Sequence, residues 1–394
     1  MIGTSRTRFC FAVFFAVASQ QLSARQTSGA PPEPAPAQKP DAAPEPPKKG
    51  LEFKIGESTL KVGGYVKLNL IHDFDRIGST DSFDPRTIDT SGLDGENTRM
   101  HARDTRINLD LRTPTDIGEL KTYIEGDFFG DGNAFRLRHA YGQIDHLLAG
   151  QTWTTFMDED AMPTTLDFES PTAFPLIRQA QVRYTQKFEG GGYAAVSLED
   201  PNNDLVSPPG VPGVEESPIP DINARVRLEN ERGHVQLGLW GGMTKFQPDA
   251  GASDNVELWG VNLATKERTW GDDYAILQLT YGDGVGRYRG GVTAAPDSDG
   301  NLEAVRMSAW MGAYMHSWSP KYRSTVTYSA GRGDLPGGAP ADANEAVTYL
   351  ATNLIWQYCD RAWVGIEYLH GTLDEFDGDD GAADRVQLSW RFDL

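Results

Sequence analysis

The chain has 394 residues and a formal net charge of −20, with 42 glycines, 9 tryptophans, 14 tyrosines and 17 phenylalanines. An acidic chain repels phosphate groups instead of displacing their counterions, so a nucleic-acid partner is excluded. The mean hydropathy is −0.46, and no apolar run approaches the roughly 20 residues of a spanning helix, which excludes a helical membrane protein. Two classes remain, a soluble all-β protein and a membrane β-barrel.

The N-terminus has the pattern of a secretory signal. Two arginines precede a short apolar core over residues 9–18, and small residues follow it. This order is typical of a signal peptide that is cleaved during export. Ala24 and Ala18 are the two candidate cleavage sites, and we take residues 1–24 as the signal peptide.

Residues 25–50 form a segment rich in proline and alanine with scattered charges. Such a composition cannot bury enough apolar surface to offset the chain entropy lost on folding. The segment therefore predicts an extended, disordered periplasmic linker.

From residue 60 onward, apolar and polar residues alternate. Ile107, Leu109 and Leu111, for example, alternate with Arg106 and Asn108. A period of two predicts β-strands that present one apolar and one polar face. The same alternation occurs near residues 60–70, 119–128, 223–229, 234–239 and 385–394.

The connections between these strands alternate between short and long. Short turns, such as residues 114–116 and 231–233, separate long segments at residues 72–100, 155–177, 200–221, 244–254, 282–303, 331–345 and 371–383. Short periplasmic turns and longer outer loops are typical of bacterial outer-membrane barrels. The alternation predicts an all-β fold over residues 51–394, a transmembrane antiparallel β-barrel of about 16 strands.

One long connection predicts a constriction. A barrel of about 16 strands is too wide for side chains to fill and leaves an aqueous channel. Residues 155–177 carry Phe, Met and Leu at intervals, which predicts that they fold inward against the wall. Their acids would then face the lumen, and these are Asp158, Glu159, Asp160, Asp167 and Glu169.

Arginines in the inward phase predict a basic wall opposite this loop. An arginine on the lipid face would cost about 2–4 kcal/mol near the midplane, so the lumen is favoured. The guanidinium fork pairs with carboxylates, which favours small anionic solutes. Alternatively, the arginines pair with Asp110, Glu119, Glu125 and Glu229 and only stiffen the barrel. The predicted wall consists of Arg106, Arg112, Arg136, Arg138, Arg183, Arg225 and Arg227.

Several motifs resemble the DcaP-like porin family. They lie at residues 63–68, 136–142, 150–158, 163–171 and 178–185, and the last three read GQTWTTFMD, PTTLDFESP and RQAQVRYT. The resemblance implies a homotrimeric outer-membrane channel that prefers anionic solutes such as dicarboxylates. Its other expected partners are outer-membrane lipid and lipopolysaccharide. Members can carry a periplasmic coiled coil where this chain has its Pro-rich linker.

No enzyme signature competes with this interpretation. The seven histidines lack metal-ligand spacing and no Gly-x-Ser-x-Gly motif occurs, so we expect neither catalysis nor a cofactor or metal. The predicted function is an outer-membrane porin for passive diffusion of small hydrophilic, anionic solutes. The alternative is a structural barrel that anchors the envelope through residues 25–50 without significant transport.

Overall fold

The structure is a computed structural model that describes residues 51–201, 205–206, 211–289 and 291–394. The predicted signal peptide and linker lie outside the described residues. Within the described part, no helix is long and apolar enough to cross a membrane. The strands are β1 (Leu51–Ile55), β2 (Ser58–Asp73), β3 (Asn97–His101), β4 (Arg106–Thr115), β5 (Gly118–Asp127), β6 (Arg136–Ile144), β7 (Leu147–Trp153), β8 (Arg178–Lys187), β9 (Tyr193–Glu199), β10 (Gly213–Glu216), β11 (Asp221–Glu229), β12 (Gly233–Pro248), β13 (Asp254–Arg268), β14 (Tyr274–Asp283), β15 (Ala294–Pro296), β16 (Leu302–Ala304), β17 (Arg306–Ser319), β18 (Tyr322–Asp334), β19 (Asn344–Cys359), β20 (Ala362–Glu375) and β21 (Asp380–Asp393). Four short 3₁₀-helices lie between them, η1 (Pro85–Thr87), η2 (Asp131–Asn133), η3 (Glu159–Ala161) and η4 (Val285–Arg289).

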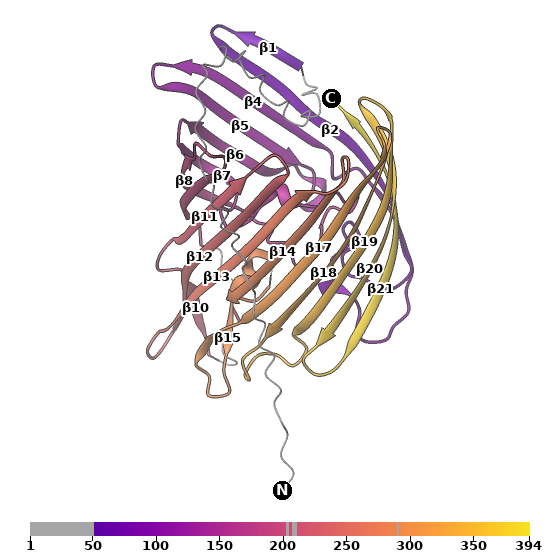
Figure 1. The fold of residues 1–394 in the computed structure, drawn as a ribbon. Helices are drawn as coiled ribbons and strands as arrows, with labels where there is room; N and C mark the ends of the chain where they lie inside the picture. Colours follow the sequence, from indigo (N-terminus) through magenta and orange to yellow (C-terminus); the bar gives the residue numbers. More distant parts are fainter. Residues whose placement is uncertain (1–50, 202–204, 207–210, 290) are drawn as a thin grey trace, which may run out of the picture. The chain divides into compact units, whose positions relative to one another are not determined.

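The main sheet closes on itself because the first long strand pairs with the last. β2 pairs antiparallel with β21 from Tyr65 to Asp73 on one edge, and with β3 and β4 on the other. β3 and β4 pair with successive parts of the same edge of β2 and therefore count as one strand of the barrel. In the same way, β1 continues the edge of β2 that pairs with β21, and β10 continues the edge of β12 that pairs with β11. The described residues thus form a closed antiparallel barrel of 16 strand positions, which confirms the predicted fold (Figure 1).

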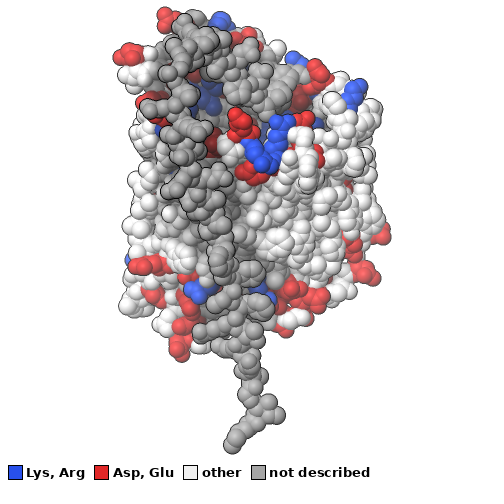
Figure 2. All heavy atoms as spheres, viewed as in Figure 1, with Lys and Arg blue, Asp and Glu red and all other residues white. Residues whose placement is uncertain are grey.

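The two faces of the wall follow the predicted alternation. On β12, Leu237 and Leu239 point outward and are 40% and 45% exposed, whereas Gln236 is buried on the inner face. Outward aromatic side chains such as Trp356 and Tyr368 are also exposed. Figure 2 shows that the middle of the visible wall is mostly uncharged and that most charged side chains gather toward its ends. This pattern is typical of a lipid-facing apolar band.

The wall has unequal height around the barrel. β7 and β9 have 7 residues each, whereas β12 and β19 have 16. The side formed by β6 to β9, whose strands have 7 to 10 residues, is therefore low. Residues 155–177 start at this low side, where they connect β7 to β8.

Two further connections also fold inward. In residues 74–96, Phe83 and Ile88 pack in a buried cluster with Tyr349 of β19. In residues 284–305, Tyr288 packs against Trp240 of β12. The sequence analysis treated these segments only as outer loops; their apolar side chains instead cover inward-facing apolar groups of the wall.

Arginine at an outward position midway along β12 should destabilise the barrel more than arginine near a strand end. We expect Leu239→Arg to lower the free energy of unfolding by about 2–4 kcal/mol, because the charge would lie in lipid near the midplane. Leu228→Arg, one residue before the end of β11, should cost about 0–1 kcal/mol. Denaturant unfolding in lipid vesicles, followed by tryptophan fluorescence, measures both. Equal losses would contradict the lipid-facing assignment.

Candidate functional site

Residues 155–177 run along the inner face of the barrel instead of extending outward. The connection leaves β7 at Trp153, and Thr154 N–H donates to the Ile177 carbonyl at 3.1 Å where the two ends meet. Phe156, Met157 and Phe174 are fully buried. Apolar side chains therefore cover the inner wall, while backbone groups of the loop bind polar side chains of the strands.

The first half of this loop is held by β11 and β12. The Asp158 carboxylate lies 3.2 Å from Arg227 Nη1 and 2.7 Å from His234 Nε2. The Met157 carbonyl accepts hydrogen bonds from Gln236 Nε2 at 2.9 Å and Arg225 Nη1 at 3.3 Å. All four wall side chains are in the inward phase of their strands, so the strand alternation itself builds this anchor.

The tip of the loop is held by a buried carboxylate on β20. Glu367 is fully buried and accepts the backbone N–H groups of Leu166 at 2.9 Å and Asp167 at 2.7 Å. Its other oxygen accepts from Asn353 Nδ2 at 2.9 Å, and Asn353 also donates to the Thr164 carbonyl. Buried polar groups are costly unless hydrogen-bonded, so this carboxylate and the loop tip depend on each other.

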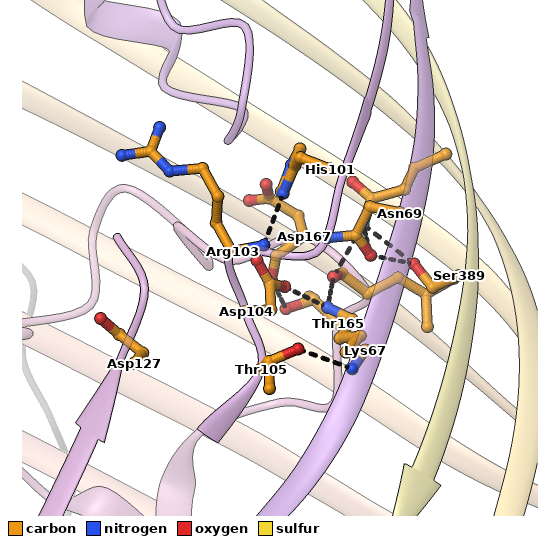
Figure 3. A network of polar contacts seen from close by, with 12 residues as sticks. Lys67, Asn69, His101, Arg103, Asp104, Thr105, Asp127, Thr165, Asp167 and Ser389 are labelled. Carbon is orange, nitrogen blue, oxygen red and sulfur yellow. Dashed lines mark hydrogen bonds and ion pairs between the residues drawn. The ribbon is translucent and has the colours of Figure 1, made fainter. Parts of the chain in front are cut away.

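The seam between β2 and β21 adds a second contact to the loop tip. Lys67 Nζ donates to the Leu166 carbonyl at 2.6 Å and pairs with Asp104 at 2.5 Å. Gln387 Nε2 donates to the same carbonyl at 2.9 Å. Figure 3 shows Lys67, Asp104 and Asp167 in one polar network at this point. The loop thus reaches from β11 and β12 to the closure of the barrel.

The five predicted loop acids have different environments. Glu159 and Asp160 are exposed, and Glu169 is partly exposed. Asp158 and Asp167 are buried, so the expectation that all five acids face the lumen is wrong for these two. The cause is local, because wall and backbone donors surround both carboxylates and take them out of the water.

The two buried carboxyls differ in acidity. Burial disfavours ionisation of Asp158, but the hydrogen bond and charge of His234 and the charge of Arg227 hold its pKa below the usual value. Burial raises the pKa of Asp167 to about 6, opposed by the charge of Arg385 and the Phe83 N–H. Asp158 is therefore the more acidic of the two buried carboxyls.

Besides Arg227, four of the predicted arginines form ion pairs along the wall. Arg106 and Arg138 lie 3.8 and 2.9 Å from Glu125 of β5, and Arg136 lies 2.8 Å from Asp127. Arg112 pairs with Asp110 at 3.1 Å and Glu119 at 3.0 Å near the β4–β5 turn. The pairing proposed as a stiffening role in the sequence analysis is therefore present at these positions.

Arg183 on β8 and Arg225 on β11 are different. Neither has a carboxylate within ion-pair distance among the described residues, and Nε of each is buried without a hydrogen-bond acceptor there. Arg225 lies 5.0 Å from the centroid of the Tyr193 ring, and Arg227 shares that ring at 5.9 Å while pairing with Asp160 at 2.7 Å.

Arg178 is a further arginine at this wall that the strand alternation did not predict. Its guanidinium lies 4.4 Å from the centroid of the Trp153 ring, which Arg138 also approaches at 5.9 Å. It too lacks a carboxylate partner among the described residues. Arg178 stands at the first position of β8, in the outward phase, so alternation gave no signal for it. The Trp153–Arg178 register across β7 and β8 places it beside the basic wall.

Comparisons with known proteins identify this architecture. The sequence model of the DcaP outer membrane protein family matches residues 52–394. The crystal structure of the outer membrane channel DcaP of Acinetobacter baumannii is similar, with 25% identity, coverage of 87% of this chain and 99% of that chain, and a TM-score of 0.78. No curated protein matches.

More distant solved outer-membrane proteins share the fold. The anion-selective porin from Comamonas acidovorans is 13% identical and covers 86% of this chain and 100% of its own, with a TM-score of 0.57. The trimer form of OmpT from Vibrio cholerae is 12% identical and covers 86% and 99%, with a TM-score of 0.54. Because the family match spans nearly all of the barrel, the chain belongs to the DcaP outer membrane protein family, whose fold is that of an outer-membrane porin.

Proposed function

We propose that this porin conducts small, hydrophilic, anionic solutes by passive diffusion and favours dicarboxylate-like molecules. One observation carries the proposal: Arg178, Arg183 and Arg225 lie along the wall without carboxylate partners among the described residues. None of these three charges is therefore neutralised by a paired carboxylate, so their field can attract a passing anion. A guanidinium fork binds a carboxylate through two parallel hydrogen bonds, and two such groups suit a solute with two carboxylates.

The inward-folded loop supports this proposal as the element that narrows the channel. Glu159 and Asp160 are exposed on residues 155–177, while the wall of β4, β6, β8 and β11 carries the arginines. Opposed charges across a narrow passage set ion selectivity. We propose that the arginines Arg106, Arg136, Arg138, Arg183, Arg225 and Arg227 guide anions, with Arg112 stiffening the periplasmic end. The carboxylates of Asp158 and Asp167 hold the loop, whereas Glu169 is partly exposed.

We also propose a homotrimer in the bacterial outer membrane, reached through a cleaved signal peptide. OmpT of Vibrio cholerae is known in a trimer form. The low side of this barrel carries outward apolar side chains, and Val182 and Leu198 are both 53% exposed there. Outer-membrane lipid would surround the remaining wall, with lipopolysaccharide at its outer edge. We propose no catalytic activity for this channel.

Removing charge from the wall should shift ion selectivity. In planar bilayers with a KCl gradient, we expect stepwise conductance and an anion-selective reversal potential, as the Comamonas acidovorans porin is anion-selective. Arg106→Ala combined with Arg183→Ala should move the reversal potential toward zero or reverse its sign, because two of the wall's positive charges are lost.

Arg306→Ala combined with Arg332→Ala is the matched control. Both arginines are exposed and pair with Asp283 and Glu345 outside the basic wall, so the same change in net charge should leave the reversal potential nearly unchanged. Equal shifts in both double variants would contradict a selective wall. Absence of any conductance in the parent protein would overturn the channel and favour the envelope anchor.

Releasing the loop tip should widen the passage. We expect Glu367→Ala to raise the single-channel conductance and its fluctuations, because the N–H groups of Leu166 and Asp167 each lose an acceptor at about 1–3 kcal/mol. Ile366→Ala controls for the strand, since Ile366 is outward and 49% exposed. An unchanged conductance in correctly folded Glu367→Ala would mean that the loop does not narrow the channel.

A further inference from the structure

Three inward-folded connections meet at Glu169. Arg86 comes from η1 in residues 74–96, Glu169 from residues 155–177 and Arg289 from the end of η4. Glu169 Oε1 lies 3.6 Å from Arg86 Nη2 and 3.5 Å from Arg289 Nη1. Two guanidinium groups thus converge on a single carboxylate oxygen.

The two arginines are held in place without the help of this carboxylate. Arg86 donates through Nε and Nη2 to Asp84 at 2.8 and 2.6 Å, and through Nη1 to the Arg289 carbonyl. Arg289 Nη2 donates to the carbonyls of Glu169 at 2.8 Å and Ser170 at 2.7 Å. The guanidinium pair is therefore preorganised by backbone carbonyls and by Asp84.

The Glu169 carboxylate itself is loosely bound. Charge-assisted N–H···O bonds typically measure about 2.7–2.9 Å, and its contacts to Arg86 and Arg289 are clearly longer. Arg289 Nε is buried without a hydrogen-bond acceptor among the described residues. The side chains of Arg86 and Glu169 retain exposures of 22% and 24%, so water reaches the pair.

We propose that Arg86 and Arg289 form a carboxylate-binding site that Glu169 occupies in the absence of solute. A preorganised pair of guanidiniums with one unused N–H, a weakly held internal carboxylate and access to water are the properties of a site that exchanges its occupant. An incoming carboxylate replaces Glu169, binds between the two arginines and is passed toward the wall arginines. The internal acid lowers apparent affinity, because solute binds only to the fraction of channels whose site is vacant.

This inference rests on the proposed anion channel and names a recognition step within it. The test uses succinate as the probe and measures the concentration that half-blocks the KCl current of single channels in planar bilayers. Glu169→Gln keeps the size of the side chain and removes the competing charge. We expect the half-blocking concentration to fall about three- to tenfold, which corresponds to an internal occupancy of about 70–90%.

Glu303→Gln is the matched control. Glu303 is exposed on β16, in the same connection as Arg289, and its substitution changes the net charge equally. We expect it to leave the half-blocking concentration within twofold of the parent. Arg86→Gln combined with Arg289→Gln should raise that concentration at least threefold, and heat-dependent gel migration verifies that each variant is folded.

The outcomes separate this proposal from the proposed function. An anion-selective parent channel in which Glu169→Gln and Glu303→Gln behave alike overturns the Arg86–Arg289 site and leaves the anion channel intact. A rise in the half-blocking concentration with Glu169→Gln also overturns it, because Glu169 would then support solute binding. A parent channel without conductance or anion selectivity overturns the proposed function itself.

Discussion

The buried carboxylate of Glu367 fixes the interior of this barrel. Its oxygens accept backbone N–H groups at the tip of residues 155–177, on the side of the barrel opposite the strands from which the loop starts. A buried charge without these donors would be strongly unfavourable, and the loop tip without the carboxylate would leave buried N–H groups unpaired. The loop in turn positions Glu169, and Tyr288 of the next inward connection packs on its Phe156. Glu367 therefore fixes the tip of the loop on which another inward connection packs.

The net charge of −20 hides an uneven distribution. Acids are numerous in the outer connections, where Glu375, Asp377 and Asp379 lie close together in the β20–β21 turn. On the inner wall, two carboxylates, Glu125 and Asp127, serve Arg106, Arg136 and Arg138, while Arg183 and Arg225 have none among the described residues. An acidic protein can thus present a basic path, since the local field and not the sum of charges acts on a passing ion.

The strands could be predicted from the sequence because alternation has a direct physical cause. Leu237 and Gln236 lie on opposite faces of β12. The apolar side chain must face lipid and the polar one must face the barrel interior, because the reverse arrangement would place the amide in lipid. The inward phase of Arg225 and Arg227 followed from the same rule. Alternation says nothing about the path of a connection, however. It could not reveal that Asp158 meets His234, which is 76 residues away in sequence.

The inward path of two further connections and the position of Arg178 were not predicted for the same reason. In residues 74–96 and 284–305, apolar side chains are interspersed with acids, glycines and polar residues, so the pattern did not indicate packing inside the barrel. Arg178 lies in the outward phase of β8. It lies beside the other arginines because its guanidinium contacts the ring of its cross-strand neighbour Trp153, which Arg138 also approaches. Such contacts depend on pairing across the sheet and on tertiary closure, which no local pattern encodes.

Anomalous diffraction from crystals soaked in bromide or rubidium tests most directly the claim that an acidic chain offers anions a basic path. The account predicts bromide peaks along the inner wall beside Arg178, Arg183 and Arg225, with rubidium confined to the outer acidic connections and the exposed loop acids. Rubidium along those three arginines, or bromide found only on the outer surface of the barrel, would contradict it.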